Sequence, residues 1–401
     1  MIINNKRALA YSEQIAWVKP IEKADNIELI GINGWTCIAK KGEFKEGDLC
    51  VFFEVDSKLP ETEDWAQFLS HRNFKIKTMK LNKFGVVSQG LAMPYKDFPN
   101  VNLPFVKGVD LTEELKVTYA KDSDRSRKTN IDDKYKAIEK KHPVFFKTKL
   151  ARFLMKTNWG RNIISCIFTT KEIKRETSHG WPTYFKYVHK TDQERVENML
   201  WILDIKGPWA KTLKIDGTSS TYILEKKPFG KYEYFVLSRN VRQTDENMAN
   251  FHSDKENVYW QVSNKYKIKE FLMDYLTKNN LKYVAIQGET CGCSLGGIEI
   301  QGDPHKLKDL RFYAFDLIRS DTGVVEVTEG REICKSYGID WVPIVDDNYI
   351  LPKDFEQFKL DADGSCDIPG SSGLREGWVY RKIGQPDFSF KNISKEYLLK
   401  H

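Results

Sequence analysis

The residues best suited to chemistry are Lys214-Ile215-Asp216-Gly217, which precede Thr218-Ser219-Ser220 in a strand-like context. A lysine at a strand end, beside a carboxylate and a tight glycine turn, suits nucleophilic catalysis. Lysine has a free pKa near 10.4, so it must be desolvated or placed near other cations to lose its proton. The tetrapeptide alone is weak, because background composition would produce it on the order of once in ten chains of this length.

Further polar groups follow the lysine in order, each at the end of an apolar β-run where a sheet would present it to a shared cleft. Carboxylates can hold a hydrated magnesium ion, cations can neutralise phosphate, and an aromatic ring can stack on a base. This inventory suits transfer of a nucleotide from a triphosphate. The segments are Ser238-Arg239-Asn240, Gln287-Gly288-Glu289-Thr290, Phe312-Tyr313-Ala314-Phe315-Asp316, Arg375-Glu376-Gly377-Trp378-Val379 and Phe388-Ser389-Phe390-Lys391-Asn392-Ile393-Ser394-Lys395.

Each of these residues also has a purely structural interpretation. Lys214 and Asp216 could form a solvated surface pair, and Glu289 and Glu376 could be exposed strand ends. Phe315 alternates with Tyr313 and could belong to the core. Arg239 could form a structural salt bridge with Asp316 or a glutamate, and Lys395 could be a surface residue.

The cysteines do not suggest a metal centre. Cys291 and Cys293 are separated by one residue, which is not the spacing of zinc sites, so two strand cysteines explain them better. Seven cysteines, an odd number, do not form a disulfide framework.

Two β-containing regions would position these groups. In the first hundred residues, short β-runs alternate with glycine turns at Asn33-Gly34, Gly42 and Gly47, which predicts a small barrel or sandwich. In the second half, strands are predicted near 210–225, 232–238, 283–288, 312–318 and 377–383. The apolar positions Ile268, Phe271, Leu272, Tyr275 and Leu276 predict a helix that packs on a core. The pattern favours an α+β domain of mostly antiparallel sheet with flanking helices.

Between these regions, Leu111 to Ile173 has a different character. Residues 121–128 are charged without apolar periodicity, which predicts an exposed linker, with a phosphate-binding basic patch as the alternative. The chain has 401 residues, 41% of them hydrophobic, and a net charge of +7. These values exclude wholesale disorder and permit a polyanionic partner. No membrane-spanning run or secretion signal is present in the sequence, so we expect a soluble intracellular (for example cytoplasmic) protein.

The order of these motifs resembles the covalent nucleotidyltransferase superfamily of polynucleotide ligases and RNA capping enzymes. It is most similar to ATP-dependent RNA ligases with an N-terminal OB-fold domain. The supporting segments are Asn33-Gly34-Trp35, Lys40-Lys41-Gly42-Glu43-Phe44, Glu54-Val55-Asp56-Ser57, Lys77-Thr78-Met79-Lys80-Leu81, Val87-Ser88-Gln89-Gly90-Leu91 and 190–198. The resemblance implies an OB-fold-like barrel over 1–110, a linker or insertion over 111–173, and a nucleotidyltransferase domain over 174–401.

The same resemblance implies a role for each motif residue. Lys214 would be the nucleophile that becomes adenylylated. Magnesium or manganese would be held by Asp216, Glu289 and Glu376. Arg239 would contact the sugar or phosphate of ATP, Phe315 would stack on adenine, and Lys391 would contact the α-phosphate. Together, the nucleotide pocket would be lined by Lys190, Lys214, Arg239, Glu289, Phe315, Lys391 and Lys395.

One departure concerns the last motif. Related enzymes often end with two lysines separated by one residue, whereas the candidates here are Lys391 and Lys395. We favour Lys391 because it follows the apolar run directly. Charge clustering also suggests that Lys75, Lys77 and Lys80 contact the pyrophosphate end of ATP or the RNA backbone.

The implied reaction has three nucleotidyl transfers: Lys214 takes AMP from ATP, passes it to an RNA 5′-phosphate, and a 3′-hydroxyl then seals the ends. We expect a monomer that joins RNA ends, in a nicked duplex or single strands, as in RNA repair. Two alternatives stay open. A capping-type enzyme would use GTP and carry an OB domain after the last motif, although this chain reaches only His401. An RNA-binding protein with an inactive domain would bind RNA but form no covalent AMP.

Overall fold

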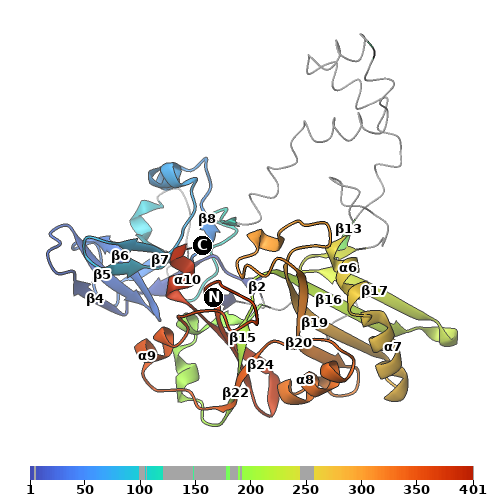
Figure 1. The fold of residues 1–401 in the computed structure, drawn as a ribbon. Helices are drawn as coiled ribbons and strands as arrows, with labels where there is room; N and C mark the ends of the chain where they lie inside the picture. Colours follow the sequence, from blue (N-terminus) through green and yellow to red (C-terminus); the bar gives the residue numbers. More distant parts are fainter. Residues whose placement is uncertain are drawn as a thin grey trace. The chain divides into compact units, whose positions relative to one another are not determined.

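The computed structural model describes residues 1–3, 6–98, 104, 106–120, 148, 178–180, 188–189, 192–243 and 257–400 (Figure 1). The chain forms two compact units. The first unit comprises Met1–Arg125, Asp192–Ile215 and Val342–His401, and the second comprises Ser126–Thr191 and Asp216–Trp341. The chain therefore crosses from the first unit to the second directly after Lys214-Ile215.

The N-terminal part of the first unit is built from short antiparallel strands, as predicted. Two three-stranded sheets have the orders β11-β7-β3 and β4-β5-β6. The turn between β5 and β6 is Asn33-Gly34, and Asn33 adopts the left-handed conformation that such two-residue turns require. The bounds are β3 (Ala10–Gln14), β4 (Trp17–Pro20), β5 (Ile27–Ile32), β6 (Trp35–Lys40), β7 (Leu49–Phe53) and β11 (Leu91–Pro94).

Shorter strand pairs complete this part of the unit. β1 pairs with β2, β10 with β9, and β12 with β8, all antiparallel. Their bounds are β1 (Ile2–Ile3), β2 (Lys6–Arg7), β8 (Ser57–Lys58), β9 (Met79–Leu81), β10 (Val86–Ser88) and β12 (Thr118–Tyr119).

Strand β7 is buried on both faces, because successive strand residues point in opposite directions. Phe52 lies in one hydrophobic cluster and Phe53 in another. The second cluster also includes Leu111 and Leu115, so the chain after residue 110 still packs into this unit. The predicted domain boundaries at 110 and 173 stay a prediction, and most of 111–173 lies outside the described residues.

The rest of the first unit carries a five-stranded sheet with the order β14-β24-β23-β15-β22. All pairs are antiparallel except β14 with β24. Phe358, Tyr380 and Phe390 form an aromatic core between this sheet and α9. The bounds are β14 (Glu194–Arg195), β15 (Trp209–Lys214), β22 (Ile344–Tyr349), β23 (Gly377–Lys382), β24 (Gln385–Ile393), α9 (Phe355–Leu360) and α10 (Lys395–Lys400).

The second unit is an antiparallel seven-stranded sheet with the order β13-β18-β17-β16-β19-β20-β21. Helices α6 and α7 pack on this sheet and on each other, and α8 packs on β20 (Figure 1). The bounds are β13 (Ser178–Gly180), β16 (Thr218–Lys226), β17 (Tyr232–Ser238), β18 (Val241–Gln243), β19 (Tyr283–Gly292), β20 (Leu310–Arg319), β21 (Gly323–Val324), α6 (Val258–Lys265), α7 (Ile268–Lys278) and α8 (Val327–Ser336).

The predicted apolar stripe from Ile268 to Leu276 is confirmed, because all five of its residues lie on α7 and are buried. The predicted α+β class with antiparallel sheets and flanking helices is also confirmed. Among the described helices, none combines the length and apolar character needed to cross a membrane.

Candidate active site

Lys214 is the last residue of β15, a strand whose other five residues are buried. It pairs with Gly377 at the start of β23. Its Nζ lies 2.8 Å from Oε1 and 2.9 Å from Oε2 of Glu376. The two side chains are 23% and 15% exposed, so solvent and a ligand can both reach the pair.

The backbone around Glu376 explains why its carboxylate lies there. Gly377 has φ +150°, and a Cβ at this position would lie 2.1 Å from the carbonyl oxygen of Asn392 on β24. Only glycine allows β23 and β24 to approach so closely. The Ser394 amide also donates to the Glu376 carbonyl at 2.9 Å, which fixes the start of β23.

Lys391 lies on β24 opposite Val379 and is buried. Its Nζ is 3.5 Å from Oδ1 of Asp192. Burial, followed by the positive charge of Arg7, lowers the pKa of Lys391 to about 7, although Asp192 acts in the opposite direction. Arg195 and Lys214 lower this pKa further, so several cations lie around one buried amine.

Two arginines, Arg7 and Arg195, lie with Lys214 around Lys391. Arg7 Nη1 is 3.5 Å from Asp192, and Arg195, which is buried, has Nη2 3.5 Å from Asp56 and lies over the ring of Trp35. Within the described part of the chain, Nε and Nη1 of Arg195 and Nε of Arg7 have no hydrogen-bond partner. We call Arg7, Arg195, Lys214 and Lys391 the cation cluster. Four cations, of which the two arginines have spare donors, are suited to a polyphosphate.

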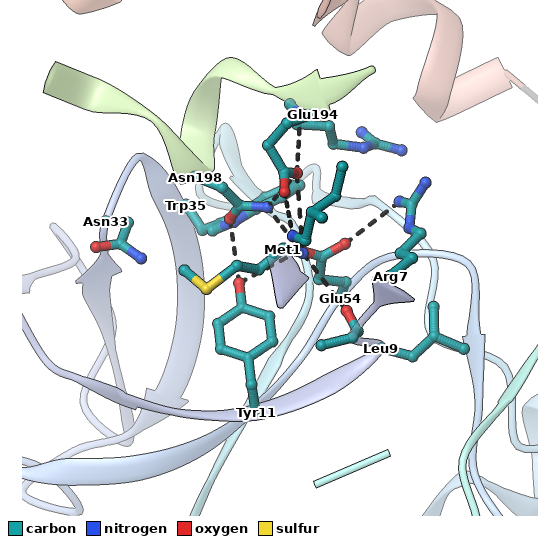
Figure 2. A network of polar contacts seen from close by, with 12 residues as sticks. Met1, Arg7, Leu9, Tyr11, Asn33, Trp35, Glu54, Glu194 and Asn198 are labelled. Carbon is teal, nitrogen blue, oxygen red and sulfur yellow. Dashed lines mark hydrogen bonds and ion pairs between the residues drawn. The ribbon is translucent and has the colours of Figure 1, made fainter. Parts of the chain in front are cut away.

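A largely buried polar network holds the segments that carry Arg7 and Arg195 (Figure 2). Asn198 Nδ2 donates to Glu54 at 2.7 Å and to Glu194 at 2.9 Å, while its Oδ1 accepts from Trp35 at 2.6 Å and from Tyr11 at 3.1 Å. The network thus ties the N-terminal β-strands to β14 and the turn that follows it.

Glu54, which is fully buried, is the central acceptor of this network. It receives Arg7 Nη2 at 3.3 Å and the amino group of Met1. Burial alone would raise the pKa of Glu54, but the charges of Met1 and Arg7 lower it to about 2. Glu54 is therefore a carboxylate at neutral pH and holds Arg7 in place beside Asp192.

In the second unit, the turn after Lys214 is held from two sides. The Asp216 amide donates to Nε2 of His305 at 2.9 Å, and His305 is fully buried. This hydrogen bond assigns the imidazole proton to Nδ1. A Cβ on Gly217 would lie 2.2 Å from the carbonyl oxygen of Thr290, so this glycine permits close contact with β19.

Glu289 and Phe315 lie on neighbouring strands of the same unit. Glu289 is the one partly exposed residue between Val284 and Gly292 on β19, and it pairs with Ser219 and Tyr313. Gln287 pairs with Asp316, whereas Gly288 pairs with Ala314, so Phe315 is the extra residue of a β-bulge. Bulges re-aim side chains, and Phe315 is only partly buried, which fits a ring available to a ligand.

The donor set suits a hydrated magnesium or manganese ion. Asp216 and Glu289 directly flank the contact between Gly217 and Thr290, and such ions need only one or two protein carboxylates when they keep water and phosphate ligands. Among the described residues, no group of three or more His, Cys, Asp or Glu side chains forms a complete protein cage for a metal.

The other predicted residues lie in different places. Arg239 is exposed in the turn between β17 and β18. Lys395 begins α10, where its Nζ is 3.5 Å from Glu356 of α9. Lys75, Lys77 and Lys80 lie in or near β9, and the last two are exposed. Lys190 lies outside the described residues.

The structure brings together Lys214, Glu376 and Lys391 in the first unit, and it places Asp216 beside the β19 end that bears Glu289 in the second. Sequence reasoning assigned no role to Arg7, Asp192, Arg195 or His305. Asp192 and Arg195 lie within the segment 190–198 that carried the family resemblance, so that segment was a usable signal for them.

Comparisons with known proteins show which families and structures the chain resembles. A family model described as RNA ligase matches residues 207–395, and one described as an OB-fold domain matches residues 9–95. No curated protein matches the chain.

Among solved structures, the chain is similar to Naegleria gruberi RNA ligase. A mutant of that protein with ATP and Mn is 27% identical, with a TM-score of 0.72 and coverage of 98% of this chain and 99% of that one. Its structure with PPi is 28% identical, with a TM-score of 0.71 and 99% coverage of both chains. A mutant with AMP and Mn is 28% identical, with a TM-score of 0.70 and coverage of 98% and 99%.

Proposed function

We infer that this chain, which belongs to the RNA ligase family, joins RNA 3′-hydroxyl and 5′-phosphate ends with ATP through a lysyl-AMP on Lys214. The observation that carries the assignment of the nucleophile is the position of Lys214. It ends a buried strand, contacts Glu376 at 2.8 Å and belongs to a cluster of four cations. An amine in such a place can attack a bound triphosphate whose charge is already neutralised.

In the first step, Nζ of Lys214 attacks the α-phosphorus of ATP. A nitrogen–phosphorus bond forms, the bond to the bridging oxygen breaks, and pyrophosphate leaves. Nζ must first lose a proton and separate from Glu376. Lys391, Arg7 and Arg195 would neutralise the charge of the phosphates as the bond to pyrophosphate breaks.

The divalent ion would be held by Asp216, Glu289 and Glu376, partly through its water shell. When bound, it supplies positive charge that stabilises the triphosphate and the departing pyrophosphate. The manganese in the structures of Naegleria gruberi RNA ligase with ATP and with AMP supports this role for a divalent ion here. Phe315, re-aimed by its bulge, would stack on adenine, and Arg239 would contact the sugar or phosphate.

Two further transfers complete sealing. AMP passes from Lys214 to the 5′-phosphate of one RNA end, which restores the free lysine. The 3′-hydroxyl of the other end then attacks that phosphate, forms the phosphodiester bond and releases AMP. Because this chemistry restores broken strands, we propose a role in RNA repair by a monomeric enzyme.

Sealing assays test this function directly. The wild-type protein would be incubated with ATP, manganese and nicked duplexes whose 3′ end is a ribonucleotide or a deoxyribonucleotide. We expect sealing that prefers the 3′ ribonucleotide and requires ATP. Equal sealing of all-DNA nicks would contradict the RNA preference, and labelling of the protein by GTP alone would contradict the assignment as a ligase.

A further inference from the structure

The turn between β16 and β17 carries an aromatic side chain that is almost fully exposed. The side chain of Phe229, within Pro228–Gly230, is 98% exposed. Its φ of +62° lies in the left-handed region, which bulky residues rarely adopt, and Gly230 follows with φ +71°. The turn is closed by the Lys227 amide, which donates to the Lys231 carbonyl at 2.7 Å. The backbone thus holds one ring out into solvent.

Exposed lysines lie on the hairpin and beside it. Lys226 and Lys231 are on the hairpin itself, and the Lys226 amide donates to the Lys282 carbonyl at 2.8 Å, which brings the exposed Lys282 beside Lys226. Tyr232, 40% exposed, lies opposite Lys226 and offers a second ring.

The acidic residues of the hairpin are neutralised locally. Lys227 Nζ lies 2.6 Å from Glu225 and 3.3 Å from Glu233, and Arg242 lies 3.0 Å from Glu233. The charge that the tip presents is therefore positive, and it comes from Lys226, Lys231 and Lys282.

The hairpin tip lies at one end of β16, and the proposed metal ligand Glu289 lies beside the other end. Strand β16 pairs along its length with β17 and β19: Ser219 lies beside Glu289 at one end, and Glu225 lies beside Tyr283 at the other. Nine residues of strand span roughly 30 Å. A stacked nucleic-acid strand covers that length with on the order of nine nucleotides.

A single exposed aromatic residue is common on protein surfaces and alone indicates nothing. A protein-binding surface would favour a broader apolar patch, whereas here one or two rings are flanked by lysines. Aromatic rings beside cations are typical of surfaces that bind single-stranded nucleic acid, where the ring stacks on a base and the cations bind phosphates. A base within a duplex has no free face, so the ring selects an unpaired one.

We propose that the β16–β17 hairpin tip binds single-stranded RNA, with Phe229 stacking on an unpaired base and Lys226, Lys231 and Lys282 contacting the adjoining phosphates. This inference rests on the proposed function, because it takes RNA to be the substrate. It adds the substrate class: an RNA with unpaired nucleotides at the tip, roughly 30 Å along β16 from Glu289.

Fluorescence anisotropy tests the proposal without requiring sealing. Labelled single-stranded RNA of about 20 nucleotides, the same RNA as a blunt duplex, and a five-nucleotide strand would be titrated with the full chain. Replacing one stacking aromatic side chain by alanine typically costs about tenfold in affinity. We expect Phe229→Ala to weaken binding of the long single strand about tenfold, Phe229→Tyr to preserve it, and duplex binding to stay within twofold.

The charge of the tip gives a second readout. Replacing Lys226, Lys231 and Lys282 by glutamate should make the negative slope of log affinity against log salt shallower by about two for single-stranded RNA. The rate of lysyl-AMP formation should not change in any of these variants, because none of the residues proposed to contact ATP lies at the tip.

Equal affinity of wild-type protein and Phe229→Ala for the long single strand would overturn the proposal, as would an equal loss on the duplex. Failure of the proposed function would be recognised separately, as absence of lysyl-AMP in the wild-type protein whatever its affinity for RNA.

Discussion

Nζ of Lys214 and Oε1 of Glu376 lie 2.8 Å apart where β15 and β23 begin to pair, so the proposed nucleophile directly contacts a proposed metal ligand. Replacement by Glu376→Gln keeps the shape and removes the charge. We expect lysyl-AMP formation to fall about a hundredfold and to need more manganese. The rate of lysyl-AMP formation would be measured with labelled ATP, by quenching the reaction at a series of times and at several manganese concentrations. The exposed Glu396→Gln on α10 is the matched control, and an equal effect of both changes would contradict the role of Glu376.

Lys391 gives the reaction a predicted dependence on pH. Burial and Arg7 lower its pKa to about 7, so in the free protein the amine is charged below that pH and becomes neutral above it. Lys391→Arg keeps the charge at all these pH values. Above about pH 7, kcat/KM of lysyl-AMP formation should lose the contribution of this charge in the wild type but not in the variant. The ratio of kcat/KM of the variant to that of the wild type should therefore rise by up to tenfold per pH unit. A ratio that stays constant from pH 6 to 9 would show that the charge of Lys391 is not needed.

Glu54 is predicted to contribute strongly to stability. Its pKa is lowered from 4.5 to about 2, so its stabilising effect is complete above pH 4.5 and is lost as the pH falls toward 2. Glu54→Gln leaves Arg7 without its buried partner and should cost about 3–5 kcal/mol at pH 7. Thermal and urea unfolding from pH 7 to pH 3 would show the difference between variant and wild type narrowing at low pH. A difference independent of pH would argue that shape, and not charge, is what the network requires.

His305 is predicted to position Asp216 through the backbone. His305→Gln can place an amide oxygen where Nε2 accepts the Asp216 amide, whereas His305→Leu cannot. We expect His305→Gln to stay within a few-fold of wild type and His305→Leu to lose roughly tenfold or more in lysyl-AMP formation. Manganese binding, followed by the electron paramagnetic resonance of the free ion, should weaken only in the leucine variant. If the two variants behave alike at equal thermal stability, the hydrogen bond has no such role.

The fold was predictable from the sequence because its signals are local. The apolar spacing from Ile268 to Leu276 predicts α7 by itself, and Asn33-Gly34 predicts the turn between β5 and β6 without information from distant residues. Lys214, Asp216, Glu289 and Glu376 were recognisable for a similar reason, since each follows or interrupts an apolar strand at a motif. Their assignment to ATP and metal remains a proposal.

Other parts of the site could not be read from the sequence. Arg7 and Lys391 are 384 residues apart and both contact Asp192, through packing that no short pattern encodes. His305 has no motif around it, and its contact with Asp216 depends on how the loop after β19 folds back. Phe315 was ambiguous between core and ligand until the register of β19 and β20 revealed the bulge.

The most direct test of the account is the site of covalent AMP attachment. Wild-type protein would be incubated with ATP and manganese, digested, and analysed by mass spectrometry, with Lys214→Arg as the control. The account predicts one adenylyl group on the peptide that contains Lys214, and none in the variant. An adduct on another lysine, or no adduct in an otherwise folded wild-type protein, would contradict it.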